Sequence, residues 1–385
     1  MRTIRSGGAY TVAERPDVLI VGAGIVGTAC ALELASAGLS VAVLERDVVG
    51  SGATAAGMGH IVVMDDSLAQ LQLTHYSQML WDQLAHNHAG GLEYARCGTI
   101  WVAADVEEMQ AVHAKWALYH EHGITSEILD ERALYVLEPN LRPGLAGGLL
   151  VAGDSVVYPP RGAALLLEHA IHHGATWRSG DAVQLLPGGI RLTDGGTLSA
   201  EVVVLANGSR AVALAPELPI RPKKGHLAIT DRYPGFVRHQ LVEMGYIKNA
   251  HAASGDSVAF NVQPRPTGQL LVGSSRQFEV HTREIDQAIL AKMIARAIDY
   301  LPRLGDLSCI RTWTGFRAAT PDGLPLIGPH PTRPGVWLAT GHEGLGITTA
   351  LGTARLLAAQ MLGRTPEIPV SPYLPSRTFQ EPVHA

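Results

Sequence analysis

Residues 17–45 read Asp17-Val-Leu-Ile-Val-Gly-Ala-Gly-Ile-Val-Gly-Thr-Ala-Cys-Ala-Leu-Glu-Leu-Ala-Ser-Ala-Gly-Leu-Ser-Val-Ala-Val-Leu-Glu45 and predict a strand, a tight turn, a helix and a second strand. The apolar run 18–21 is typical of a parallel strand buried on both faces. Gly22, Gly24 and Gly27 follow it with GxGxxG spacing. Gly22 permits the turn, Gly24 lets the backbone approach a pyrophosphate at the helix N-terminus, and Gly27 lets helix and strand pack closely.

The second strand, residues 40–44, ends at an acidic residue, Glu45. Its sequence separation from the glycines is the one at which a carboxylate can accept hydrogen bonds from ribose hydroxyls. An acidic residue here favours an unphosphorylated ribose, so FAD or NAD is preferred over NADP. A glycine-rich structural turn is the alternative, but the strand, the helix and the acid all agree with dinucleotide binding.

Composition limits the class of protein. The 385 residues are 46% hydrophobic and 17% charged with a net charge of -5, and no basic patch suggests nucleic-acid binding. The three cysteines form no CxxC pair, which argues for a reducing compartment and a cytoplasmic protein, with membrane association only through partners. The longest apolar run, 18–32, is too short for a membrane span.

The segment 46–60 is rich in small residues. We expect its backbone and the hydroxyls of Ser51 and Thr54 to face phosphate or ribityl oxygens. A mobile linker is the alternative, but the run follows the ribose-binding acid and stays apolar.

Strand and helix patterns alternate at both ends of the chain. We predict helices at 67–86, 106–122, 161–173, 283–301 and 345–362, strands at 93–103, 182–186, 190–192 and 201–205, and an antiparallel sheet within 221–273. The prediction is an α/β fold with two interleaved domains. The dinucleotide domain comprises 1–90, 145–220 and 305–385, and the substrate domain comprises 91–144 and 221–304.

Two motifs near the carboxyl end carry a family resemblance. Gly315-Phe-Arg-Ala-Ala-Thr-Pro-Asp-Gly-Leu-Pro-Leu-Ile-Gly328 and Gly341-His-Glu-Gly-Leu-Gly-Ile347 closely resemble the closing signature of the D-amino-acid oxidase superfamily, particularly its glycine and sarcosine oxidase branch. Residues 222–226 and 264–273 resemble segments of the same branch. The resemblance implies a glutathione-reductase-type, Rossmann-like domain that binds extended FAD, with the flavin ring at the junction with the substrate domain.

The resemblance also implies the residues that contact FAD. Besides the glycine motif, Glu45 and the small-residue segment, it points to the strand end at Ala206 and to the carboxyl-terminal motifs. The full set is Gly22, Gly24, Ile25, Val26, Gly27, Glu45, Arg46, Gly52, Ala53, Thr54, Gly57, Met58, Gly59, Val183, Ala206, Asn207, Gly208, Gly315, Gly341, Gly344, Leu345, Gly346, Ile347 and Thr348. Gly315 stands near the position of a cysteine bonded to FAD in sarcosine oxidases, so we expect noncovalent FAD.

Arg317 matches the family arginine that holds the substrate carboxylate. A planar guanidinium can grip a carboxylate through two charge-assisted hydrogen bonds. Ala318 replaces the proline usual after that arginine, and Gly344 stands where some relatives carry a second basic residue, so we expect one carboxylate-binding arginine.

A general base would help to keep the substrate amine neutral. Four residues are candidates for this base by position: His60, His226, Tyr246 and His342. For each of them we expect a structural role rather than a catalytic one. A helix beginning at Leu345 would direct amides toward the flavin N1 and C2 oxygen. We predict no metal site, because an HExxH motif starting at His342 fails at Gly346.

Three functional classes remain open. Residues 50–60 and the Val-Val-Tyr-Pro-Pro segment, 156–160, most resemble catalytic subunits of bacterial D-hydroxyproline dehydrogenases, which implies oxidation of cis-4-hydroxy-D-proline or D-proline with partner subunits or a quinone as acceptor. The second class is a glycine, sarcosine or D-amino-acid oxidase that uses O2 and releases H2O2. The third is a non-catalytic flavin-carrying subunit.

Overall fold

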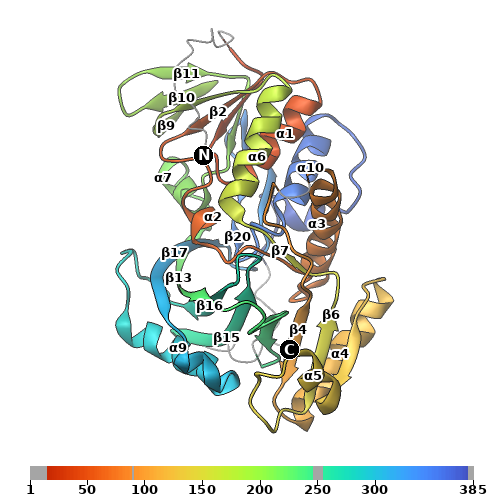
Figure 1. The fold of residues 1–385 in the computed structure, drawn as a ribbon. Helices are drawn as coiled ribbons and strands as arrows, with labels where there is room; N and C mark the ends of the chain where they lie inside the picture. Colours follow the sequence, from red (N-terminus) through yellow and green to blue (C-terminus); the bar gives the residue numbers. More distant parts are fainter. Residues whose placement is uncertain (1–14, 89–90, 246–254, 380–385) are drawn as a thin grey trace.

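The computed structural model describes residues 15–88, 91–245 and 255–379. Figure 1 shows two regions, each built on its own large sheet, with the glycine-motif strand and helix in one and the long strands β13–β17 in the other. The chain passes repeatedly between the two regions, so neighbouring strands of each sheet come from distant parts of the sequence.

The first sheet has six strands in the order β18-β19-β12-β1-β2-β8. Its central strands are paired in parallel, and only β18 is antiparallel to its neighbour. The strands are β1 (Val18–Val21), β2 (Val41–Glu45), β8 (Thr176–Ser179), β12 (Val202–Leu205), β18 (Leu326–Pro329) and β19 (Val336–Thr340). This arrangement brings the carboxyl ends of β1, β2 and β12 to one edge, where open α/β sheets bind ligands.

Both faces of the six-stranded sheet are covered. Helices α1 (Ile25–Ser36), α6 (Pro159–His172) and α10 (Ala350–Met361) form an apolar core on one face. A three-stranded sheet of β9 (Ala182–Leu186), β10 (Gly189–Leu192) and β11 (Thr197–Ser199), with α7 (Ala211–Leu214), covers the other. Double coverage explains why the central strands β1 and β12 are continuous apolar runs.

The second sheet has nine strands in the order β20-β17-β13-β16-β15-β14-β4-β6-β5. The strands are β4 (Thr99–Ala103), β5 (Glu127–Asp130), β6 (Gly147–Val151), β13 (Arg221–Arg232), β14 (Gln240–Glu243), β15 (Ser257–Pro264), β16 (Gln269–Arg276), β17 (Cys309–Ala319) and β20 (His342–Glu343). The antiparallel sheet predicted within 221–273 is confirmed, because β13, β16, β15 and β14 pair antiparallel. Beyond that range β14 runs parallel to β4.

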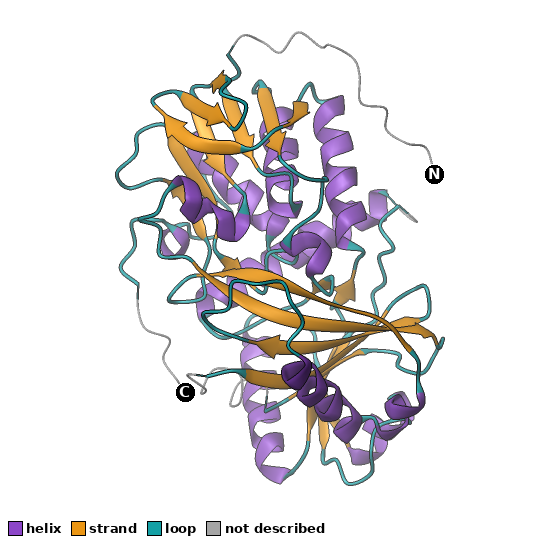
Figure 2. Ribbon diagram, turned by 90° about the vertical axis from the view of Figure 1, so that its left-hand side faces the viewer, coloured by secondary structure: helices purple, strands orange, loops and turns teal. Residues whose placement is uncertain are grey.

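Helices pack on both faces of this sheet. Helix α9 (Gln287–Tyr300) lies across β15 and β16, as Figure 2 shows, and its apolar side packs into their core, which α5 (Glu131–Leu137) also joins. Helix α4 (Val106–Glu121) packs on the other face, against Trp101 of β4 and Leu149 of β6. The Asp105, Asp130 and Asp286 carboxylates each accept backbone N–H bonds at a helix start, which fixes where these helices begin.

Helix α3 (Leu68–Asn87) and several short elements complete the described fold. The helix begins at Ser67, whose hydroxyl accepts from the Gln70 amide at 3.1 Å, and packs on α10. The remaining elements are α2 (Ala53–Ala56), β3 (His60–Ile61), β7 (Ser155–Val156) and the 3-10 turns Gly208–Arg210, Pro302–Asp306 and Ser371–Tyr373. Of the helices that the structure describes, none combines the length and apolarity needed to cross a bilayer.

Three predicted elements are shorter than expected. The helix predicted at 283–301 spans only Gln287–Tyr300, because Asp286 caps its start. The strand predicted at 93–103 is regular only over 99–103, because Glu93 and Gly98 adopt positive φ angles of 48° and 72°. The helix predicted from Leu345 begins at Ala350, after a single turn closed by the Thr349 N–H on the Leu345 carbonyl. Gly346 and three β-branched residues in succession disfavour regular helix in that turn.

The domain boundaries stay a prediction. Strands β6 and β17 pair in the nine-stranded sheet, although both fall in segments that we assigned to the dinucleotide domain. Sheet membership alone would place them with the substrate domain.

Candidate active site

The glycine turn after β1 is shaped by close backbone contacts. Gly22 has a φ of 108°, and a Cβ there would lie 2.8 Å from the Ala206 carbonyl oxygen. A Cβ on Gly27 would lie 1.9 Å from the Gly22 carbonyl oxygen, so α1 can pack on β1 only with glycine at this position. A Cβ on Gly24 would meet only the Thr54 hydroxyl, at 3.3 Å, which leaves this face of the turn open to the cavity.

These residues fit a dinucleotide phosphate. The N-cap residue of helix α1, Gly24, has no side chain, and the first turn of the helix holds no acid, so positive charge at its N-terminus is not neutralised by the helix itself. At the end of β12, the buried Asn207 Oδ1 lines the same cavity and has no hydrogen-bond partner. A helix N-terminus without a counter-charge and an unpartnered polar atom, both at one cavity, fit a ligand that carries negative charge and polar groups.

Glu45 lies at this end of the cavity but already makes two contacts. Its Oε2 accepts from the Ala23 N–H at 2.7 Å and its Oε1 accepts from the Asp47 N–H at 2.8 Å. The carboxylate therefore braces the glycine turn. Each oxygen keeps a further lone pair, so the predicted ribose contact is still compatible with these bonds.

The small-residue segment contains a one-turn helix, α2. The Thr54 Oγ1 accepts from the Ile25 N–H at 3.0 Å, so this hydroxyl caps α1 from outside and its predicted ligand contact remains untested. A Cβ on Gly315 would lie 2.4 Å from the Ala56 Cβ. The glycine on β17 is thus also explained by close packing of α2.

Arg317 lies on β17 and lines the same cavity. Its guanidinium extends over Gly225 on β13, where a Cβ would approach Nη2 to 2.9 Å and Nη1 to 3.0 Å. Nη1 donates to the Ser275 carbonyl at 2.9 Å. One fixed bond orients the guanidinium fork, and its remaining donors can take a carboxylate.

Glu343 adds an ion pair that the sequence did not suggest. Glu343 adopts a φ of 50°, and its carboxylate Oε1 lies 2.9 Å from the Lys223 Nζ. Burial favours the neutral carboxyl, but Lys223, Arg276 and Arg317 together hold the pKa of Glu343 well below its ordinary value. The group is therefore an anion beside the Arg317 guanidinium.

The candidate histidines differ in their contacts. Burial and the charge of Arg317 lower the pKa of His60 to about 4, and its Nδ1 has no partner. Burial lowers the pKa of His342 to about 3, and its Nε2 lies 3.0 Å from the Thr353 Oγ1, which ties the ring to α10. His226 is bonded at both ring nitrogens, to Ser275 Oγ at 2.9 Å and to the Asp286 N–H at 3.0 Å. His60 alone of these three keeps a buried, unpartnered ring nitrogen; Tyr246 lies outside the described residues.

One cavity of about 2080 Å³ connects the glycine turn with Arg317. This exceeds the roughly 300–1,000 Å³ of most small-molecule pockets, as a long coenzyme together with a substrate would require. Arg317, His60, His342 and 21 of the 24 predicted FAD contacts line it. Gly27, Gly59 and Thr348 do not: the two glycines are packed against backbone, and the Thr348 hydroxyl donates to the His60 carbonyl at 2.9 Å.

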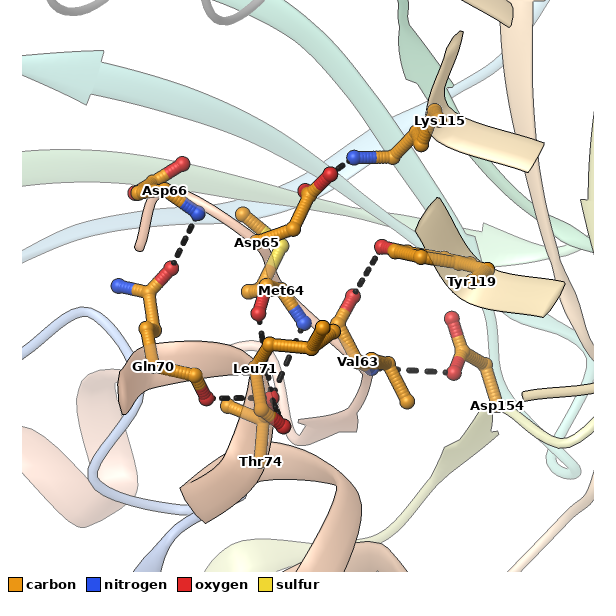
Figure 3. Close-up of polar contacts among 10 residues, drawn as sticks. All are labelled: Val63, Met64, Asp65, Asp66, Gln70, Leu71, Thr74, Lys115, Tyr119 and Asp154. Carbon is orange, nitrogen blue, oxygen red and sulfur yellow. Dashed lines mark hydrogen bonds and ion pairs between the residues drawn. The ribbon is translucent and has the colours of Figure 1, made fainter. Parts of the chain in front are cut away.

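The segment 63–66, between β3 and α3, contributes Met64 and Asp66 to the lining of this cavity and is held by contacts with α3, with α4 and with Asp154 (Figure 3). Lys115 of α4 pairs with Asp65, and both side chains are almost fully buried. The Val63 carbonyl accepts from the Tyr119 hydroxyl at 3.1 Å, and the Val63 N–H donates to Asp154 at 3.2 Å. These contacts fix the backbone at the cavity edge.

Three amide side chains of the sheet were not predicted as site residues. Gln240 and Asn261 line the cavity, and the Gln263 Nε2 donates to the Met58 carbonyl at 2.8 Å. The signal was present in β15, where Asn261 and Gln263 alternate with apolar residues and so share one face. Recognising it required knowing that this face borders the cavity and not solvent.

Known proteins resemble this chain over nearly its whole length. A family model described as FAD dependent oxidoreductase (DAO) matches residues 17–360. A glycine oxidase of Pseudomonas aeruginosa is 31% identical over 381 residues, which cover 93% of this chain and 98% of that protein. A D-amino acid dehydrogenase of Xanthobacter autotrophicus is 28% identical over 420 residues, covering 91% and 96%. The crystal structure of glycine oxidase from Geobacillus kaustophilus matches with a TM-score of 0.84 and 26% identity, covering 95% of this chain and 100% of that one.

Proposed function

Because the chain belongs to the DAO family of FAD-dependent oxidoreductases, we propose that it oxidises the Cα–N bond of a small amino or cyclic imino acid. The observation that carries this proposal is the Arg317 guanidinium, held over Gly225 by the Ser275 carbonyl in the same cavity that the glycine turn lines. Bound FAD would supply the acceptor for the hydride that leaves Cα. The relatives named glycine oxidase and D-amino acid dehydrogenase support an amino-acid substrate.

The protein's own residues would orient the substrate and keep its amine neutral. Arg317 holds the carboxylate, which fixes the position of Cα. His60 is neutral near neutral pH because its pKa is about 4, so its unpartnered Nδ1 can accept a hydrogen bond or donate one without adding positive charge. The positive potential of Arg317 that disfavours a charged His60 also disfavours a charged amine nearby.

The finer proposal is a dehydrogenase of cis-4-hydroxy-D-proline or D-proline, supported by the resemblance of segments 50–60 and 156–160. An oxidase of glycine, sarcosine or a D-amino acid is the second candidate, favoured by the glycine oxidase relatives. A non-catalytic flavin-carrying subunit is disfavoured by an arginine placed in the cavity. Partner subunits or a quinone as acceptor, noncovalent FAD and a cytoplasmic location stay predictions.

The test is anaerobic reduction of the purified yellow protein by candidate substrates. The loss of visible flavin absorbance measures the reduction. The panel is glycine, sarcosine, D-alanine, D-proline and cis-4-hydroxy-D-proline. We expect the last two to reduce the flavin fastest, and Arg317→Ala to keep FAD but lose about 2 to 5 kcal/mol of transition-state stabilisation in kcat/KM. Peroxide formed in air would identify an oxidase. Failure of every amine to bleach the flavin would reject amine oxidation.

A further inference from the structure

Two buried amide groups on the cavity wall lack partners. The Gln240 side chain is 3% exposed and the Asn261 side chain is 6% exposed, and both residues line the cavity. Neither the Gln240 Oε1 nor the Asn261 Oδ1 has a hydrogen-bond partner. Folded proteins leave few such atoms unpaired, because desolvating a polar group without a new hydrogen bond costs free energy.

The strand register places both amides on one face of the sheet. Asn261 on β15 is paired with Val242 on β14, and Gln240 is two residues from Val242. Residues two apart along a strand point to the same side. Gln240 and Asn261 are therefore close neighbours on the wall of the cavity.

The same register relates Asn261 to the Arg317 guanidinium. Asn261 is paired with Gly273 on β16, and the next pair along the strands, across an irregularity, is Val258 with Ser275, whose carbonyl accepts from Arg317. Two residues span at most roughly 7 Å and one strand spacing is roughly 5 Å, so the backbone of Asn261 and that of Ser275 lie within roughly 9 Å of each other. A small ring whose carboxylate binds Arg317 can therefore reach toward the amides with its opposite edge.

The chemistry of the two side chains selects the group that they would bind. Both amides are uncharged, and each offers an acceptor oxygen and a donor nitrogen. A hydroxyl satisfies such a pair because it donates one hydrogen bond and accepts others. An apolar edge would leave the amides unpaired.

We propose that Gln240 and Asn261 form a hydroxyl-binding subsite, which selects amino or imino acids that carry a hydroxyl on the edge remote from the carboxylate. This inference rests on the proposed function insofar as Arg317 holds the carboxylate. It makes the two amides specificity-determining residues and assigns them no part in the oxidation itself. A site built to bind a substrate hydroxyl discriminates strongly against the analogue that lacks it.

The first experiment compares cis-4-hydroxy-D-proline with D-proline. We expect wild-type kcat/KM to favour the hydroxylated substrate by at least about 10-fold. Gln240→Met and Asn261→Leu keep similar volume and remove the hydrogen-bonding groups, so each should move the ratio toward one. Gln110→Met is the matched control, because Gln110 is exposed on α4, and it should leave the ratio at the wild-type value.

The second experiment does not require oxidation. Cis-3-hydroxycyclopentane-1-carboxylate and cyclopentanecarboxylate lack the amine, and their Kd values are measured from the change they cause in flavin absorbance. We expect the hydroxylated acid to bind wild type at least about 10-fold more tightly, with the preference lost in Gln240→Met and Asn261→Leu. If no amine reduces the flavin, the proposed function fails while this ratio still decides the subsite.

A Kd ratio near one in the wild-type protein overturns the subsite, whatever the variants do. A preference that persists in both variants, with FAD retained, overturns the assignment to Gln240 and Asn261.

Discussion

The position of the Arg317 guanidinium can be tested without altering the arginine. Gly225→Ala adds one methyl group on β13, and its Cβ would lie 2.9 Å from Nη2 and 3.0 Å from Nη1 of Arg317. Ordinary contacts between such atoms are roughly 3.5 Å or longer. The nearest atoms that the new methyl group meets all belong to this flexible side chain, so the guanidinium is expected to shift while the sheet stays intact.

The expected loss of kcat/KM follows from the hydrogen bond of Arg317 that the new methyl group would disturb. Displacing the guanidinium breaks or weakens its bond to the Ser275 carbonyl, or its grip on a carboxylate. A hydrogen bond to a charged group is worth about 1.5 to 3 kcal/mol. Since 1.4 kcal/mol corresponds to tenfold, kcat/KM should fall by about 10- to 150-fold.

The assay is steady-state kinetics on the best amine of the panel, with FAD content measured from the flavin spectrum. Gly255→Ala is the control, because a Cβ there meets nothing within 4 Å and the residue has no positive φ. In an Arg317→Ala background the Gly225→Ala change should cost little, since the atoms it displaces are gone. Equal losses in both backgrounds would refute the proposed position of the guanidinium.

Three further predictions concern the cofactor end and the buried charges. Glu45→Ala should weaken FAD retention more than Glu45→Gln, which can still accept from the Ala23 N–H; FAD release on dilution measures this, and equal release would contradict it. Burial raises the pKa of Asp154 to about 7, so the folded protein holds a proton that the unfolded chain releases above about pH 4. As the pH rises from about 4 to about 7, the free energy of unfolding should therefore fall, and Asp154→Asn should reduce this dependence on pH. Parallel curves of Tm against pH for the two proteins would argue against a raised pKa of Asp154. Lys115→Met leaves the buried Asp65 charge unpaired and should cost about 3 to 5 kcal/mol in chemical denaturation, with recovery in Lys115→Met/Asp65→Leu; no loss in the single variant would show that the pair is not buried in solution.

The glycine turn and the presence of Arg317 in the cavity wall could be predicted because their evidence is local. Gly22 and Gly27 are required by contacts within one strand-turn-helix unit, and those contacts follow from the spacing of the glycines. Arg317 lies within the motif 315–328, and the motif predicts the position of the arginine. By contrast, the helix boundary at Ala350 depended on a turn whose backbone bonds no periodicity reveals.

The histidines show where reasoning from position ends. His60 and His342 both line the cavity, as their neighbouring motifs suggested, yet one ring keeps an unpartnered nitrogen and the other is tied to Thr353. That difference arises from side-chain contacts between segments far apart in the sequence. Sequence spacing carries no information about them.

The α/β class, the dinucleotide turn and the family could be read from the amino acids alone, because hydrophobic periodicity and fixed glycine spacing act within a short stretch of chain. Which polar residues of the nine-stranded sheet face the cavity depends on the folded arrangement. Asn261 and Gln240 come from separate strands, and their shared position depends on the register between those strands and on the helices that cover the opposite face. Register is set by packing across the whole sheet, so no single strand encodes it.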